Sequence, residues 1–294
     1  MITDKSLSSK VLDIVVHTVM IIVLTVTLYP VLFVLAASFS SKVAVDAGQV
    51  TIYPIGFHFD NYRLVFSETR IMRAFANSVR YTAIGTLANL AVTGMMAYSL
   101  SRKQLAFRKF YTWVIIIPLY FSGGLIPTFI LMVGLGFYGS MWALILPNLV
   151  GITNLIIMRT FFQSLPLELE ESASLDGAND LLIFFRIILP LSKPVVFTIL
   201  LYYLVGYWNS WFSAFIYLPD AKMAPLQLVI RELIIMSQSI LESVESGTIN
   251  VLGEINLNGI RYATLFVSMI PMLVIYPFIQ KYFVQGVMIG SLKG

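Results

Sequence analysis

Charged side chains are absent from most of the chain, and their absence divides the sequence into long apolar stretches. Five stretches lack Asp, Glu, Lys and Arg altogether: residues 14–41, 81–101, 110–158, 194–219 and 262–280. A helix crosses roughly 30 Å of hydrocarbon with about 20 residues, so four stretches fit one crossing each and the longest fits two. The longest stretch contains three glycines within GLGFYGS, residues 134–140, which predict a turn between its two crossings. The pattern therefore predicts an all-α polytopic membrane protein with six transmembrane helices.

The predicted crossings form a single transmembrane domain, residues 1–294. Their expected positions are about 14–39, 76–101, 110–133, 140–162, 194–218 and 262–281. The chain is 58% hydrophobic and 12% charged, with a mean hydropathy of +0.86, which is too apolar for an ordinary water-soluble core. With no Cys and only His17 and His58, the sequence offers neither thiol chemistry nor a cluster for a metal or for catalysis. We therefore expect no enzyme and no bound metal.

Basic residues predict the orientation of the crossings. Two lysines precede the first crossing, and the short link between the second and third holds four basic residues and no acid. These residues are Lys5 and Lys10, then Arg102, Lys103, Arg108 and Lys109. The positive-inside rule places this link and both termini in the cytoplasm. The link after the first crossing is a mild counterweight, since it also carries basic residues, but they are spread over a longer segment. Because the basic residues flank apolar stretches, the net charge of +4 does not indicate nucleic-acid binding.

The predicted crossings contain small residues and prolines. Gly85, Ala88, Gly94 and Ala97 provide small surfaces for close helix packing in the second crossing. Six prolines interrupt the backbone bonding of several crossings: Pro30, Pro118, Pro127, Pro147, Pro271 and Pro277. Any one of them is equally well explained as a harmless kink. Together they favour a bundle that moves or lines a pore.

The sequence shows no side chain or motif that could couple transport to a source of energy within this chain. None carries a carboxylate, histidine or basic group near its centre, where a proton-coupled carrier commonly places one. The sequence also lacks a GxxxxGK[ST] loop for nucleotide phosphates. If transport is active, its energy comes from another subunit.

The loop at residues 164–192 is polar and acidic at its start, unlike its surroundings. Ser164 and Pro166, followed by several glutamates, predict a helix start with a hydroxyl cap and acids at the positive end of the helix dipole. Asp176-Gly177 predicts a tight bend, because glycine tolerates positive φ. A second short helix over residues 181–188 is expected to end at Leu189-Pro190. The predicted arrangement of helix, elbow and helix exposes Glu171, Leu175 and Asp176 to a partner.

This loop resembles the EAA loop of ATP-binding-cassette (ABC) importer permeases, EAAxxxG followed by nine residues and IxLP. The matching residues are Glu171-Ser172-Ala173, Gly177 and Ile187-Ile188-Leu189-Pro190, with Ser172 in place of alanine the one departure. Four other matches resemble the carbohydrate, maltose-type branch: Asn61-Tyr62, Asn77-Ser78, the run 97–102 and Trp208-Asn209. Three more look most like its subgroup for complex oligosaccharides: the run 122–127, Pro225-Leu226-Gln227 and the run 290–294. The likeness covers nearly the whole chain.

The resemblance implies a type I ABC importer permease bundle in the bacterial cytoplasmic membrane, importing a carbohydrate, with an oligosaccharide expected. Its partners would be a homologous second permease, two ATPase subunits that bind ATP and Mg²⁺, and an extracytoplasmic solute-binding protein. This chain itself would hold no cofactor. The loop at 164–192 would dock on the ATPase as a coupling helix through Glu171, Ser172, Ala173, Leu175, Asp176, Gly177, Ile187, Leu189 and Pro190. A C-terminal tail with Gly290, Lys293 and Gly294 would also reach the ATPase.

Two of these roles have simpler explanations. Glu171 is our candidate for a charge-assisted contact with a basic ATPase residue, yet an acid at this position also stabilises the helix dipole alone. An idle tail fits the C-terminal residues nearly as well as an ATPase contact.

The fifth crossing is rich in aromatic side chains that suit a sugar pathway. Tyr203, Tyr207 and Asn209 are the pathway candidates, because a hydroxyl or amide in hydrocarbon is costly without a partner. Trp211 and Phe212 fit an interfacial aromatic belt or plain packing better. After this crossing, apolar residues at helical spacing predict an amphipathic helix on the outer rim. The polar residues 242–259 beyond it would contact the binding protein or remain a solvated loop.

Three alternatives remain at this stage: a permease for another solute class, a channel or secondary carrier, and a membrane enzyme. The lack of catalytic clusters counts against the enzyme, and the uncharged crossing centres count against a proton-coupled carrier. A carrier with a Na⁺ site made of backbone carbonyls is not excluded by the residues.

Overall fold

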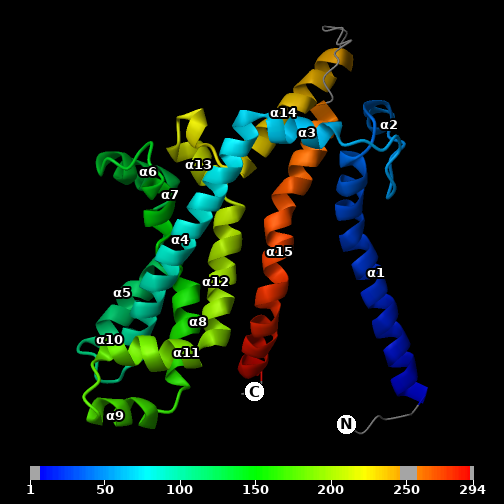
Figure 1. Ribbon diagram of the computed structural model, residues 1–294. Coiled ribbons are helices and arrows are strands. Elements are labelled where there is room, and N and C mark those ends of the chain that lie inside the picture. Colours follow the sequence, from blue (N-terminus) through cyan, green and yellow to red (C-terminus); the bar gives the residue numbers. More distant parts are fainter. Residues whose placement is uncertain (1–6, 246–256, 292–294) are drawn as a thin grey trace. The chain divides into compact units, whose positions relative to one another are not determined.

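The computed structural model describes residues 7–245 and 257–291, and this part of the chain is helical without a strand. The first helices are α1 Leu7–Ser38, α2 Lys42–Asp46, α3 Asp60–Ser67, α4 Thr69–Ser101, α5 Arg108–Tyr120, α6 Leu125–Gly134, α7 Trp142–Ile145 and α8 Ile152–Gln163 (Figure 1). They are followed by α9 Glu168–Leu175, α10 Asp180–Ile183, α11 Leu189–Leu191, α12 Lys193–Trp208, α13 Phe212–Tyr217, α14 Leu226–Glu245 and α15 Leu257–Ser291. Short 3₁₀ turns occupy Leu146–Asn148 and Ala221–Met223, and a π-helix occupies Phe184–Ile188.

Candidate membrane spans are of two kinds. By length and composition, α1, α4 and α15 are each suited to cross a membrane as one helix. Three further candidates are pairs of consecutive helices bent at a short break, and counting each pair as one span gives up to six. The first pair is α5 with α6, bent by 118°, and the second joins α7 and its 3₁₀ turn to α8, bent by 53°. The third joins Asp180–Leu191 to α12 and is bent by 87°.

The breaks follow from residues that interrupt helices. Between α5 and α6 the backbone turns at Gly124, whose φ is +84°, a conformation that favours glycine. The stretch predicted as a turn between the third and fourth crossings follows α6, and Gly136 and Gly139 there have φ of +77° and +76°. In the fifth crossing the helix stops at Trp208 and resumes at Phe212. The third, fourth and fifth predicted crossings are therefore broken helices.

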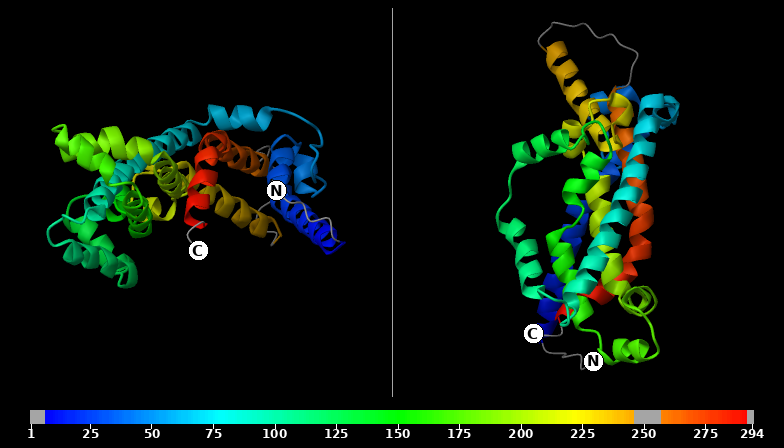
Figure 2. Two further views of the ribbon diagram at one scale, coloured as in Figure 1. Left: turned by 90° about the horizontal axis from the view of Figure 1, so that it is seen from below. Right: turned by 90° about the vertical axis from the view of Figure 1, so that its left-hand side faces the viewer.

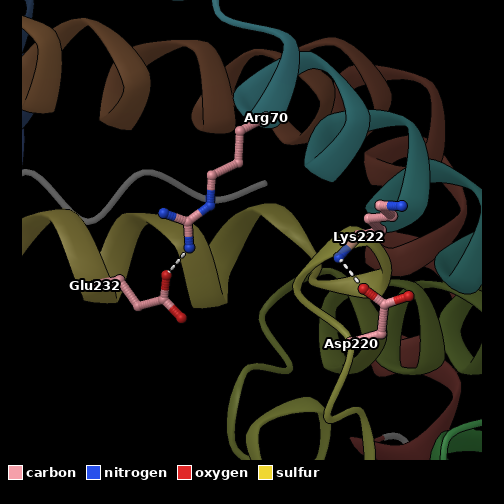
Figure 3. A network of polar contacts seen from close by, with 4 residues as sticks. All are labelled: Arg70, Asp220, Lys222 and Glu232. Carbon is pink, nitrogen blue, oxygen red and sulfur yellow. Dashed lines mark hydrogen bonds and ion pairs between the residues drawn. The ribbon is translucent and has the colours of Figure 1, made fainter.

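The chain divides into two compact units, one made of 1–72 and 230–270 and the other of 73–229 and 271–294. In the first unit, the described side chains of α1 are buried only at its C-terminal end. There Ala36 and Ala37 form a small buried cluster with Ala44 and Val50. The remainder of α1 presents apolar side chains outward along most of its length. The same unit contains an ion pair between Arg70 of α4 and Glu232 of α14 (Figure 3).

The second unit has its core where α4, α8 and α12 run side by side (Figures 1 and 2). The core residues are Ala97, Tyr98, Met158, Phe162, Ile183, Phe184, Ile188, Val195, Ile199 and Tyr203. Small residues of α4 allow the close approach that the sequence predicted. A Cβ atom added at Gly94 would lie 3.4 Å from Phe184 Cζ, and one added at Gly85 would lie 2.5 Å from Tyr207 Cζ.

The N-terminal half of α4 also fixes the connection between α13 and α14. Asn77 Nδ2 donates to the carbonyl of Lys222 at 2.8 Å and to that of Ala224 at 3.1 Å. Ser78 Oγ accepts the backbone N–H of Leu226 at 2.8 Å. Within the connection, Asp220 caps the 3₁₀ turn, because its carboxylate accepts the backbone N–H of Lys222 at 2.8 Å (Figure 3). This connection is therefore an ordered part of the second unit.

Candidate functional site

The loop at residues 164–192 has the predicted arrangement of helix, elbow and helix. Helix α9 ends at Leu175, and Gly177 follows with φ of +85°. No atom lies within 4 Å of a Cβ placed there, so the backbone conformation, rather than a close approach, requires glycine. Asn179 then caps α10 by accepting the backbone N–H of Leu182 at 2.8 Å.

The predicted hydroxyl cap at Ser164 is wrong. Ser164 follows the last residue of α8, and its hydroxyl donates backwards to the carbonyl of Phe161 at 2.7 Å. Helix α9 begins later, at Glu168, with Leu167 before it and no side-chain cap. The serine closes the preceding helix, and Pro166 lies between the two.

The elbow presents a group of exposed side chains. Glu171, Ser172 and Asp176 are exposed, and Leu175 is 89% exposed, although it is a large apolar residue. Ala173 is half-buried and packs against the core. Because Ser172 is exposed and bonds only backwards to the carbonyl of Glu168 at 2.8 Å, serine in place of alanine disturbs no packing within the chain.

The second half of the loop is buried on one side and exposed on the other. Ile187 and Leu189 are half-buried against the core, whereas Pro190 is exposed. The helix does not end at Pro190 as predicted but continues to Leu191 and bends into α12. Proline lacks an N–H and its ring crowds the carbonyl four residues earlier, which accounts for the wider π-helical turn before it.

An ion pair that was not predicted ties this loop to α4. Arg102, directly after α4, pairs with Glu170 of α9, and the two side chains are only 14% and 12% exposed. The guanidinium of Arg102 also lies 4.4 Å from the ring centroid of Tyr98. Burial raises the pKa of Glu170, and the charge of Asp180 raises it further, while Arg102 acts in the opposite direction without reversing the shift. No local signal in the sequence joins these residues, although both carry charges beside apolar segments.

A cleft of about 790 Å³ lies among α4, α5, α7, α8 and α12 of the second unit. Tyr203 and Tyr207 line it, as do Asn89, Asn148 and Ser210, and none of its lining residues is charged. Asn209, the third pathway candidate, is exposed at the end of α12 and does not line it. The structure thus brings together two of the three candidates.

Tyr203, Tyr207 and Asn89 at the wall of the cleft are each hydrogen-bonded. Tyr207 Oη donates to Asn89 Oδ1 at 3.0 Å, and Asn89 Nδ2 donates to the carbonyl of Asn148 at 2.8 Å. Tyr203 Oη accepts the backbone N–H of Gly151 at 2.9 Å and lies 2.7 Å from Thr93 Oγ1. The tyrosines therefore connect α12 to α4 and to the break before α8.

Two predicted sites lie outside the residues whose side chains the structure describes. One is the C-terminal tail from Gln285 onward, with Gly290, Lys293 and Gly294, and the other is most of the polar segment 242–259. Within the described residues, no group of three or more His, Asp or Glu could hold a metal ion.

The arrangement combines helices suited to cross a membrane, an uncharged polar cleft and an exposed elbow, which defines the chain as a membrane transport subunit. No protein-family model matches it. The polygalacturonan/rhamnogalacturonan transport system permease protein YtcP of Bacillus subtilis is 39% identical over 98% of this chain and 100% of its own length. The galactooligosaccharides transport system permease protein GanQ of the same organism is 30% identical over 92% of this chain and 91% of its own.

A solved structure agrees with these relatives. It is a bacterial ABC transporter involved in the import of the acidic polysaccharide alginate, and one of its chains matches with a TM-score of 0.85 and 29% identity. The match covers 95% of this chain and 98% of that one. The chain belongs to the sugar permeases of ABC importers. The predicted family and the all-α permease fold are confirmed, and the chain is a transport subunit rather than an enzyme.

Proposed function

We propose that this chain forms half of the membrane pathway of an ATP-driven importer for oligosaccharides. A second permease would form the other half, two ATPase subunits would bind ATP and Mg²⁺, and an extracytoplasmic binding protein would deliver the sugar. Relatives that transport polygalacturonan/rhamnogalacturonan and galactooligosaccharides support a sugar chain as the substrate. The neighbour that imports alginate supports the same class.

The exposed elbow carries the proposal. Leu175 is a large apolar side chain that is 89% exposed beside the carboxylates of Glu171 and Asp176. Leu169 and Leu181 of the same loop are also exposed. Several exposed apolar side chains on one charged loop support a surface that a partner covers. We assign this surface to the ATPase, with Glu171 contacting a basic residue and Leu175 entering the docking cleft. This assignment, with the basic link that contains Arg102, places the loop in the cytoplasm. With an even number of spans, both termini lie in the cytoplasm of the bacterial cell as well.

A pair of charge reversals separates docking from helix stability. Glu171→Lys should weaken ATPase attachment or uncouple hydrolysis from uptake. Glu168→Lys is the matched control, because Glu168 is also exposed in the first turn of α9 and lies nearer the positive end of the helix. A mere dipole role for Glu171 predicts that the control is at least as harmful. Co-purification of the ATPase with each variant measures the difference, and equal ATPase recovery would remove Glu171 from the docking surface.

The cleft is the proposed path of the sugar. Its volume of about 790 Å³ exceeds that of a single sugar ring, and its hydroxyl and amide groups can bond to sugar hydroxyls. Tyr203 and Tyr207 are the proposed pathway residues. Asn209 lies outside the cleft, so its exposed amide would meet a sugar only beyond the cleft.

Reconstitution tests the whole proposal. The complex purified through this chain, placed in vesicles with its binding protein, should accumulate oligogalacturonides or galactooligosaccharides only when ATP is supplied on the ATPase side. Monosaccharides serve as the control substrate. Uptake without ATP, or recovery of this chain as an active transporter by itself, would overturn it.

A further inference from the structure

Helix α9 is held to the rest of the chain by few contacts. It buries none of its residues, and Ala173 is its half-buried contact with the core. A cavity of about 620 Å³ lies between the loop and α4, lined by Ser174 on one side and Met95 and Ser99 on the other. The ion pair between Arg102 and Glu170 spans this gap.

This ion pair differs from the others in the described part of the chain. Its side chains are 14% and 12% exposed, against 49% and 42% for Arg70 and Glu232. Exposed pairs contribute little because water and salt screen them. A largely buried pair is costly to break, since the remaining partner keeps its charge without compensation. The contact beneath α9 is therefore costly to break, whereas the pair at Arg70 is not.

Arg102 is fixed to α4 in turn. Its backbone N–H donates to the carbonyl of Ser99 at 3.3 Å, and its guanidinium lies over Tyr98, which is buried in the core. A displacement of Glu170 therefore acts on the end of α4 rather than on a mobile link.

Helix α4, which ends just before Arg102, also contacts the tyrosines of the cleft. A stripe of α4 with a spacing of four residues meets the tyrosines of α12: Gly85 lies beneath the Tyr207 ring, Asn89 accepts from its hydroxyl, and Thr93 bonds to Tyr203. Because α4 runs unbroken from Thr69 to Ser101, one rigid element connects the ion pair with the cleft.

We propose that Arg102 and Glu170 are positioning residues that make α4 follow α9, so that movement of the docked loop reaches the tyrosines of the cleft. This inference rests on the proposed ATPase docking of α9. It assigns the two residues no contact with ATP, sugar or the ATPase.

Neutralising the pair in the reconstituted complex tests the inference. Arg102→Gln should leave ATPase attachment unchanged and lower the sugar imported per ATP hydrolysed by about two- to thirtyfold, the range found for residues that carry coupling. Arg102→Lys keeps the charge and should retain most of the coupling. Combining Arg102→Gln with Glu170→Gln should be no worse than either single change, because neither charge is then left alone.

Controls distinguish this inference from a structural role and from failure of docking. Arg70→Gln removes an exposed partner of Glu232 and should not change the ratio. A merely structural role for Arg102 would lower uptake and hydrolysis together with the amount of assembled complex, and would refute the inference. An unchanged ratio in Arg102→Gln would also refute it. If Glu171→Lys fails to weaken ATPase attachment, the docking proposal fails instead, whatever the ratio.

Discussion

Of the two glycines of α4, Gly85 is the one where an added methyl group should be more harmful. A Cβ atom there would lie 2.5 Å from Cζ of Tyr207 and 2.7 Å from Cε1 and Cε2. Carbon atoms that are not bonded prefer separations of about 3.5 to 4.0 Å. The variant Gly85→Ala therefore requires the ring or the helix to retreat by about 1 Å.

The ring has little freedom to retreat. Its hydroxyl donates to Asn89 at 3.0 Å, and Asn89 is 1% exposed and is itself bonded to the carbonyl of Asn148. Separating the helices costs about 1 to 3 kcal/mol of overpacking, and losing the hydroxyl bond adds about 0.5 to 1.5 kcal/mol. Alanine recovers about 1 kcal/mol of helix propensity. The net expected loss is about 0.5 to 3.5 kcal/mol in the free energy of unfolding.

The matched control is Gly206→Ala, in the last turn of α12. No atom lies within 4 Å of its added Cβ, so the same substitution gains the propensity without a clash. The free energy of unfolding, measured by reversible unfolding in mixed micelles, should be equal to that of the parent or higher for Gly206→Ala. It should be lower than that of the parent for Gly85→Ala. In a Tyr207→Ala background the Gly85 substitution should no longer destabilise, because the atoms it meets are gone. Equal stability of the two alanine variants in the parent would refute the reasoning.

Three further changes have definite expected outcomes. Gly177→Val forces a β-branched residue to a φ of +85°, costing roughly 1 to 2 kcal/mol locally, and should speed proteolysis of the loop more than Gly177→Asn. Tyr203→Phe leaves a backbone N–H unpaired and should lower the unfolding free energy by about 1 to 3 kcal/mol, whereas Tyr202→Phe, at an exposed residue, should not. Asp180→Asn removes a charge that raises the pKa of Glu170, so an infrared titration of carboxyl groups should show Glu170 ionising at lower pH; an unchanged or higher pKa would contradict this.

Local chemistry made the loop at 164–192 predictable. The positive φ of Gly177 and the exposure of Glu171 depend on the residue itself and its near neighbours, which the sequence states directly. The cap failed for a related reason: a serine hydroxyl bonds to the carbonyls behind it as readily as to the N–H groups ahead, and Ser164 does the former.

The sequence did not predict which side chains are buried by contacts between helices that are distant in the chain. The burial of Glu170 rather than Glu171, and its pairing with Arg102, depend on how α9 is turned relative to α4, which the spacing of acids along one helix does not fix. Asn209 and Tyr203 looked alike as costly polar groups in an apolar segment. The helix stops at Trp208, which leaves Asn209 exposed, while Tyr203 is buried against Thr93.

The hydrogen bonds within the cleft bear on how a sugar would pass. Tyr203 Oη already accepts from Gly151 and bonds to Thr93, and Tyr207 already donates to Asn89. At these two tyrosines a sugar hydroxyl would compete with existing bonds, apart from the lone pairs left on the Tyr207 oxygen, so its net gain per contact there is small. Passage requires binding that is weak enough to release the solute. On the proposed function, selection of the sugar therefore falls mainly to the delivering protein, and Tyr207→Phe should alter uptake rate more than it alters which oligosaccharide is imported.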